Sequence, residues 1–429
     1  MVERPFTNDT EPSSNWTRRT FMSTVGVSSI GGLSMAVQAN DGDNDSRTMY
    51  FTNEQVLNCL QGRDIAGGTG YETDLGLEDA DIIVEDRDSL TDAFNSNVDV
   101  IGIPGDTEID LSGDDYELSN QTLVSDRGVN GSEGALLYTT DHGDDSPAWD
   151  GGSNGRGVIT VAGDSRISGI RYRGPYHDHY DNEEYPGYIP LADGETYEER
   201  QEMRRDHYAR GLWIIDDDVE IDNCELYGWP MQAITIGSSS TVVSPHIHHI
   251  YGHDCMMVGA GYVVDVLNGH PTIEMSYFNA TCHSISGFGH PECGYTLEDC
   301  VFGPSTYSHA VDMHCLAENG YGDDLTAGDR VEVRRCTFGF THNIEGQNAQ
   351  AIVFRGYPED QYVTENCWFL HDVDGTVENV ANAGYEPVPY RQVNVGSNWH
   401  DWEFSGNHYG LDAPSESGVG APANLEVSE

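Results

Sequence analysis

A degenerate six-residue repeat constrains the fold of this chain more than any other feature of its sequence. Each copy ends in Leu, Ile or Phe and carries Cys, His or Ser two residues earlier. Side chains two apart on a strand share a face, so we expect the fourth and sixth positions to point into a core together. Successive copies start 24 to 36 residues apart, which suits one coil of a solenoid plus its loops. The copies start at Ile221, Pro245, Ile273, Leu297, Val333 and Thr364, and residues 167–172 fit the same frame.

A second apolar block follows five of the six copies. Aligning these blocks places one branched aliphatic residue of each in a single column. Neighbouring coils of a parallel stack lie about 4.8 Å apart, so the residues of one column contact one another. The repeat and the blocks together predict an all-β, single-domain parallel β-helix. The column consists of Ile234, Val258, Ile285, Val311 and Ile352.

Cysteine also follows the repeat. The chain has nine cysteines, and four of them take the fourth position of a copy. In-register Cys side chains inside a solenoid behave as small apolar groups. We therefore expect free, buried thiols at these positions, although export from the cell would ordinarily invite disulfides. The four are Cys224, Cys300, Cys336 and Cys367.

Two helical segments are predicted outside the repeat. Residues 88–94, with an acidic N-cap, predict a short helix that caps the N-terminal end of the solenoid. Residues 175–210 are dense in Tyr, His and acids and interrupt the solenoid, and residues 196–207 within them favour a helix. Such an insertion is either a functional loop or a decorated surface loop. We place the lead-in at residues 40–87 and the solenoid at residues 88–410.

The start of the predicted solenoid resembles a known superfamily. A short helix, a strand ending in Pro104-Gly105 and the segment Ile109-Asp110-Leu111 are similar to the usual beginning of the pectate-lyase-like right-handed parallel β-helix superfamily. The resemblance covers roughly residues 88–410 in architecture, and no subfamily's catalytic signature is complete. It implies a right-handed coil and an enrichment in polysaccharide lyases, hydrolases and epimerases. A fold alone does not establish an activity.

The charge balance indicates adaptation to high salt. The chain has 73 acidic and 20 basic residues, a net charge of -53, and all of its basic residues are arginine. Such a surface repels itself unless salt screens it. Hydrophobic residues, 37% of the chain, recur throughout, which argues against disorder. Nucleic acid and anionic membranes are poor partners for this field, and we expect a monomer.

The N-terminus predicts export. Residues 17–22 resemble a twin-arginine motif, residues 25–37 are modestly apolar, and cleavage is expected after Ala39. Residues 1–39 are therefore interpreted as a signal peptide of a secreted protein. No later stretch is apolar enough to span a bilayer. Residues 411–429 are rich in Ser, Gly, Pro and Glu and are expected to be a disordered tail.

Three ionisable residues are predicted to converge on the outer face of the second blocks. If the aliphatic column points inward, Asp312, His314 and Arg355 point outward, and His314 and Arg355 share a column. Phe288 lies in that column on the preceding coil and can stack on a sugar. For β-elimination from a uronic acid, Arg355 would neutralise the sugar carboxylate, His314 would be the base, and Asp312 would orient it or hold a cation. Ca²⁺ is a possible cofactor, and a solvent-facing salt bridge is the alternative.

Further histidines are candidates with weaker support. His283 and His309 precede the aliphatic column and either hydrogen-bond backbone or shape the site. His290 follows Phe288 on a loop near the same edge, and His253 follows a cluster at residues 246–249. A metal site in that cluster is possible, although it has no recognised ligand spacing.

The first hypothesis for function is a lyase acting on an acidic polysaccharide. A glycoside hydrolase needs two carboxylates about 6.5–9.5 Å apart for inversion, and Asp312 has no outward acidic neighbour in the aligned blocks. A noncatalytic surface or carbohydrate-binding protein is the third reading. We expect outward substitutions at Asp312, His314 and Arg355 to leave the fold intact.

Overall fold

The computed structural model describes residues 65–143, 157–176, 197–238, 240–257, 259–303, 305–339, 342–343, 350–370, 388–395, 401–410 and 419–420. These residues belong to one compact unit, Val37–Glu426. The predicted signal peptide, the first part of the lead-in, most of the tail and Val258 lie outside the described residues. So does the part of the insertion at residues 177–196.

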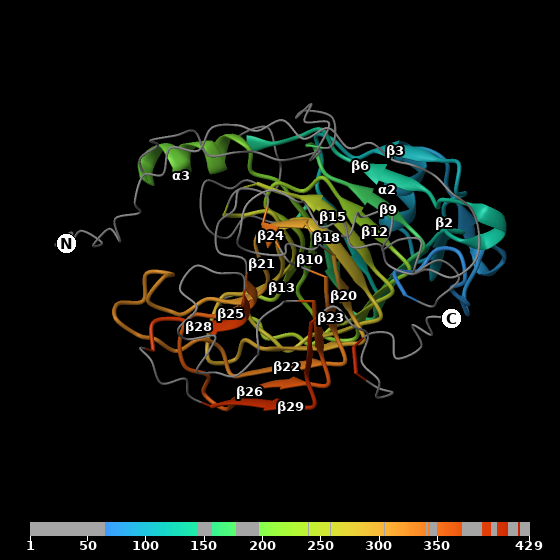
Figure 1. Cartoon of the computed structure of the whole chain (residues 1–429). Coiled ribbons are helices and arrows are strands. Elements are labelled where there is room, and N and C mark those ends of the chain that lie inside the picture. Colours follow the sequence, from blue (N-terminus) through green and yellow to red (C-terminus); the bar gives the residue numbers. More distant parts are fainter. Residues whose placement is uncertain are drawn as a thin grey trace, which may run out of the picture. The chain divides into compact units, whose positions relative to one another are not determined.

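The first face of the solenoid is a parallel sheet of 11 strands within the described ranges (Figure 1). Its strands pair in chain order, one from each successive coil, and β22, β26 and β29 lie side by side in Figure 1. We call it sheet A. Its strands are β1 (Ile82–Ile83), β2 (Val100–Gly102), β5 (Thr122–Val124), β8 (Ser165–Ser168), β11 (Val219–Asp222), β14 (His246–His248), β17 (Thr272–Glu274), β19 (Tyr295–Glu298), β22 (Arg330–Arg334), β26 (Gln361–Glu365) and β29 (Trp402–Ser405).

The remaining described strands form a second parallel sheet, sheet B, made of two ladders. The long strand β18 joins the ladders, because it pairs with β20 of the first and with β21 of the second. The first ladder contains β3 (Glu108–Asp110), β6 (Leu136–Tyr138), β9 (Arg171–Arg173), β12 (Glu225–Tyr227), β15 (Tyr251–Cys255), the start of β18 (Tyr277–Gly287), β20 (Val301–Phe302), β23 (Thr337–Phe338), β27 (Trp368–Phe369) and β30 (His408–Tyr409). The second contains β4 (Tyr116–Ser119), β7 (Ile159–Ala162), β10 (Arg210–Ile214), β13 (Gln232–Ile236), β16 (Tyr262–Val266), the end of β18, β21 (Ser305–Met313), β24 (His342–Asn343), β25 (Gln350–Phe354) and β28 (Val388–Gln392).

Between the first and last described coils, each coil contributes one strand to sheet A and at least one stretch of strand to each ladder of sheet B, and the predicted all-β parallel β-helix is confirmed. A left-handed backbone residue makes the corner between sheet A and the first ladder. It is the third residue of the repeat, which explains how the first and fourth positions, three residues apart, both point inward. These corner residues are Asn223, His249, Met275, Asp299, Arg335 and Asn366.

The strand pairing confirms five of the six predicted repeat copies and corrects one. The pairs Ile273 with Leu297 and Leu297 with Val333 align as predicted. In the second copy, however, Ile247 rather than Pro245 pairs with Ile221. The corner at His249 sets this frame, so the prediction was wrong by two residues there. His248 lies outside the core, and Ile250, fully buried, takes the position next to Cys224.

The second blocks contain a similar error. Pairing joins Ile285 with Val311 and Val311 with Ile352, as predicted. The residue that pairs with both Ile234 and Ile285 is Val264, and not Val258. The misalignment by six residues arose because an irregular turn separates β15 from β16. Its consequence for the functional site is described below.

Stacked side chains fill the interior. Phe302, Phe338 and Phe369 pack face to face, with ring centroids 4.7 and 4.8 Å apart, which is the spacing of neighbouring coils. The second copy carries Gly252 in this column because a Cβ there would lie only 2.9 Å from Cδ1 of Phe278. The four cysteines of the repeat are buried and free, as predicted. Burial raises the pKa of the Cys224 thiol to about 12.

Both predicted helices are present. Helix α2 (Arg87–Phe94) is capped by Asp86, whose side chain accepts a hydrogen bond from the backbone of Ser89. Leu90 and Ala93 of α2 are buried against the solenoid. Helix α3 (Tyr197–Asp206) lies in the insertion. The described chain also has two 3-10 helices, η1 (Leu77–Asp79) and η2 (Val129–Gly131), and strand β1 begins sheet A upstream of residue 88. No helix of the described chain is long and apolar enough to cross a membrane.

Candidate functional site

Two aspartates lie in one outward-facing column of sheet B. Parallel pairing aligns Asp265 of β16 with Ser286 of β18, and Ser286 with Asp312 of β21. Asp265 and Asp312 are therefore two coils apart, and their backbones are separated by about 10 Å at about 4.8 Å per coil. We call Asp265, Ser286 and Asp312 the aspartate column.

Sequence analysis missed Asp265 because the second block was aligned on Val258. With Val264 in the aliphatic column, the next residue faces outward in register with Asp312. The expectation that Asp312 has no outward acidic neighbour is thus wrong. The alternation Val263-Val264-Asp265-Val266, with a lone acid inside an apolar strand, is the signal that would have identified it.

Asp312 is outward with respect to the coil but is completely buried by neighbouring side chains. Arg355 donates two hydrogen bonds to Asp312, from Nε to Oδ1 at 2.9 Å and from Nη2 to Oδ2 at 2.5 Å. Burial raises the pKa of Asp312, but the charges of Arg355 and His314 outweigh burial and hold it well below the usual range. Asp312 is therefore an ionised carboxylate held by Arg355 and covered by its neighbours, and the salt bridge is not solvent-facing.

His314 connects Asp312 to a second carboxylate. The pairing of Met313 with Phe354 places His314 beside Arg355, as predicted. His314 Nε2 lies 3.3 Å from Asp312 Oδ2, and Nδ1 lies 3.2 Å from Glu318 Oε2. Both nitrogens thus face carboxylates.

Glu318 is the accessible carboxylate of this group. Its side chain is 33% exposed, whereas that of Asp312 is fully covered. Burial raises the pKa of Glu318, but the hydrogen bond from His314 and the charge of Arg355 together lower it by more, so the pKa lies below its ordinary value. An ionised carboxylate in contact with solvent can bind and activate a water molecule. The repeat pattern contained no signal for Glu318, which lies in the loop after β21.

His283 and His309 cover the other side of Asp312. Their rings are stacked with centroids 5.3 Å apart, and His283 Nε2 lies 3.5 Å from Asp312 Oδ2. Nδ1 of His283 faces the backbone carbonyl of His309 at 3.1 Å and donates to it. Burial lowers the pKa of His283 to about 4, so this ring is neutral at pH 7. Burial also lowers the pKa of His309. His283 was expected either to hydrogen-bond the backbone or to shape the site. It does both, because it donates to the backbone of His309 and also lies against Asp312.

Asp265 has the opposite electrostatic environment to Asp312. It is buried, and Gln232 Nε2 donates to its Oδ2 at 3.2 Å. Arg210 is held behind Gln232, with Nε 2.6 Å from Gln232 Oε1. Burial raises the pKa of Asp265 to about 6, although the charges of Arg210 and His314 oppose the rise. Asp265 is therefore a carboxyl group that stays protonated up to about pH 6.

An aromatic cluster lies beside His314. Phe288 follows β18, and its ring stacks on that of His290 with centroids 5.1 Å apart. Tyr321 packs edge-on against both rings and is 51% exposed. Residues 288 and 290 were predicted as sugar-binding residues, whereas Tyr321 was missed because it lies in a loop. An exposed aromatic ring beside acidic groups is a surface on which a sugar ring can stack.

His253, also predicted to bind substrate, lies elsewhere. It is on β15, where Nε2 contacts Glu225 at 3.0 Å and Nδ1 contacts Asp254 at 2.7 Å. Burial lowers the pKa of His253, but Tyr251 and the two carboxylates raise it well above its ordinary value. These contacts tie together β12 and β15, and they do not reach the aspartate column.

The ligand atoms of His283, Asp312 and His314 lie within 4.8 Å of one another, as a metal site would require. Both oxygens of Asp312 already accept hydrogen bonds from Arg355, which supplies the positive charge that a metal would bring. Ca²⁺, which takes six to eight oxygen ligands, does not suit a group with two imidazoles. The arrangement therefore fits proton transfer better than metal catalysis.

Comparison with known proteins adds little to this geometry. No protein-family model matches the chain, and no curated protein is significantly similar to it. Among solved structures, the chain is similar to the catalytic unit of a thermostable GH87 alpha-1,3-glucanase from Streptomyces thermodiastaticus strain HF3-3. The TM-score is 0.32 and the identity 12%, over 81% of this chain and 72% of that chain. The assignment of the fold rests on the strand pairing instead.

Proposed function

We propose that this protein hydrolyses glycosidic bonds of a polysaccharide at the aspartate column. One observation carries the proposal: two carboxyl groups have pKa values displaced in opposite directions, raised to about 6 for Asp265 and lowered for Glu318, which contacts His314 beside the aspartate column. Pairs of carboxyl groups whose pKa values are displaced in opposite directions are typical of the acid and base of glycosidases. The aromatic cluster of Phe288, His290 and Tyr321 supplies a surface for sugar stacking beside them.

The exposure of each group suggests its role. Asp265, protonated below about pH 6, would donate a proton to the leaving glycosidic oxygen. Glu318, ionised and partly exposed, would activate the attacking water. Asp312 would act as a positioning residue that holds Arg355 and His314, which in turn hold Glu318.

Elimination from a uronate is the second candidate, favoured by the concentration of arginine near the column. Arg355 lies 3.7 Å from Glu318 through Nη1, and this nitrogen is the one not engaged by Asp312. A sugar carboxylate could therefore bind there in place of Glu318. Against this reading, the two nitrogens of His314 face carboxylates, so the proposed base is occupied.

A panel of neutral and acidic polysaccharides, incubated with the protein in molar salt, tests both reactions. Hydrolysis releases reducing ends without ultraviolet absorbance, whereas elimination also creates unsaturated ends that absorb. Asp265→Asn and Glu318→Gln should each lose at least about a hundredfold in turnover. Glu292→Gln, which changes an exposed glutamate of the loop next to His290, is the matched control and should retain activity. A protein that binds a polymer without cleaving it would refute the enzymatic proposal.

We also propose that the protein acts outside the cell and in high salt. The support is the twin-arginine-like segment at residues 17–22 and the net charge of -53. A chain with this charge binds an anionic polymer only where salt screens repulsion, so neutral polymers are the better first substrates in the panel.

A further inference from the structure

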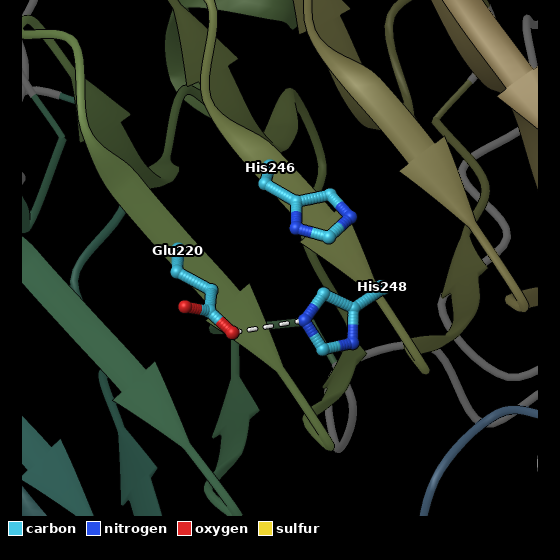
Figure 2. A group of neighbouring side chains, drawn as sticks. All are labelled: Glu220, His246 and His248. Carbon is cyan, nitrogen blue, oxygen red and sulfur yellow. Dashed lines mark hydrogen bonds and ion pairs between the residues drawn. The ribbon is translucent and has the colours of Figure 1, made fainter.

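A second group of ionisable side chains lies on the outer face of sheet A, on different strands from the aspartate column. Glu220 is on β11, and His246 and His248 are two residues apart on the adjacent strand β14. Pairing aligns Glu220 with His246. Figure 2 shows the carboxylate of Glu220 and both imidazole rings gathered on one side of the sheet.

The ligand atoms of this group are close enough to share one ion. His248 Nε2 lies 3.0 Å from Glu220 Oε1, the two imidazole centroids are 4.5 Å apart, and all three ligand atoms lie within 4.8 Å of one another. Around a tetrahedral ion with bonds of about 2.0–2.2 Å, ligand atoms lie about 3.3–3.6 Å apart. Small side-chain rotations would bring the separations between the three ligand atoms to this spacing.

Neighbouring groups prepare these side chains for a cation. His248 Nδ1 lies 2.7 Å from His249 Nδ1, and when it donates this hydrogen bond its Nε2 lone pair points at the Glu220 carboxylate. In this tautomer the Nε2 lone pair and the carboxylate, 3.0 Å apart, repel each other, and a metal ion bound by both atoms at a slightly wider separation would remove the repulsion. A hydrogen bond donated by the ring nitrogen that does not bind the metal fixes the tautomer of a metal-binding histidine.

The surrounding charge is also favourable. Glu274, on the next strand β17, lies 3.4 Å from His246 Nε2 and can serve as a fourth ligand or orient the ring. Arg166 is a cation close to this group, and its Nε is 3.6 Å from Glu220 but only 2.8 Å from Asp222. Because Asp222 and Asp74 hold that guanidinium, Glu220 keeps its charge available for another partner.

We propose that Glu220, His246 and His248 bind a divalent transition-metal ion, with Glu274 in support. Two imidazoles and one carboxylate suit Zn²⁺, Co²⁺ or Ni²⁺, whereas Ca²⁺ and Mg²⁺ prefer oxygen ligands alone. The ligands come from consecutive coils, so the ion would tie β11 to β14, and through Glu274 to β17. The site is structural and lies outside the proposed reaction.

Zinc binding by the full chain tests the proposal. Equilibrium dialysis against Zn²⁺ would be carried out at neutral pH in molar KCl with millimolar Ca²⁺ and Mg²⁺, which occupy the many surface carboxylates. The visible spectrum of bound Co²⁺ reports the ligand set. The test variants are His246→Gln, at a side chain that is 46% exposed, and Glu220→Gln. His270→Gln is the control, because His270 is similarly exposed and faces a single carboxylate, Asp329, at 3.6 Å.

The wild type should bind one Zn²⁺ that Ca²⁺ does not displace, and zinc should raise its unfolding temperature. His246→Gln should weaken this binding at least about a hundredfold and Glu220→Gln at least about tenfold, while His270→Gln should stay within about twofold. Circular dichroism without metal checks that each variant folds. Binding that is unchanged in His246→Gln, or that Ca²⁺ abolishes, would overturn the proposal, and zinc would then belong to the His283, Asp312 and His314 group or to surface acids.

Discussion

Replacing Asp265 by Asn removes the acidic proton of the proposed general acid with almost no change in the shape of the side chain. The asparagine oxygen can still accept the hydrogen bond from Gln232 that Asp265 Oδ2 receives at 3.2 Å. Its amide cannot donate a proton to a leaving sugar. We expect turnover to fall about 10²- to 10⁴-fold, which is the usual contribution of a positioned general acid. Activity of the wild type should decline as the pH rises through about 6, the raised pKa of Asp265.

The same substitution should stabilise the protein, and the sign follows from the pKa. Burial raises the pKa of Asp265 from 3.8 to about 6, so the folded chain retains this proton while the unfolded chain has lost it. Stability from this group is fully present below pH 3.8 and is lost as the pH rises through about 6. At about 1.4 kcal/mol per pKa unit, the wild type is about 3 kcal/mol less stable at neutral pH than a chain with a neutral side chain here.

Thermal unfolding measures this difference. With about 2.1 cal/mol/K of unfolding entropy per residue, 3 kcal/mol corresponds to about 4 °C for a unit of this size. Asp265→Asn should therefore unfold about 4 °C above the wild type at pH 7.5 and at nearly the same temperature at pH 3.5. Asp92→Asn, at an exposed aspartate of α2, is the control and should show no such pH-dependent gain.

Two results would refute the reasoning about Asp265. A stability difference that is the same at both pH values would show that burial does not raise this pKa. More than a tenth of wild-type turnover in Asp265→Asn would show that another group protonates the leaving oxygen. The stability arm needs no substrate, so it tests the electrostatics even before the polysaccharide is identified.

The remaining predictions concern the salt bridge, the surface charge and the thiols. Arg355→Ala removes the arginine partner of the buried Asp312 carboxylate and should lower the free energy of unfolding in urea by about 3–5 kcal/mol. Adding Asp312→Asn should restore most of this free energy, and no recovery in the double variant would contradict the pairing. Stability followed by circular dichroism should rise from low to molar salt because of the net charge of -53, and a flat response would contradict salt adaptation. The four repeat cysteines should label slowly in the native state, and native disulfides among them, found by mass spectrometry, would overturn the register.

Much of the fold was determined by the sequence alone. The alternation of inward residues around Cys300, Cys336 and Cys367 identified the coils, because stacked coils require the same residue type at the same place. The same argument predicts that His314 lies beside Arg355, as the strand pairing shows. These predictions rest on period and register, which are local properties of strands.

Only the tertiary structure decided the register of the irregular coil and the character of the site. The corner residue is left-handed at Asn223, His249 and Arg335 alike, so residue type at the corner did not reveal the frame of the second copy. The turn between β15 and β16 likewise hid the register of the second block, and Asp265 was not predicted as a site residue. Burial was also hidden, since Asp312 faces outward on its strand but is covered by side chains from other coils and a loop. A pKa depends on the dielectric and the charges that long-range packing brings together, and this is why two aspartates with the same strand geometry differ in protonation.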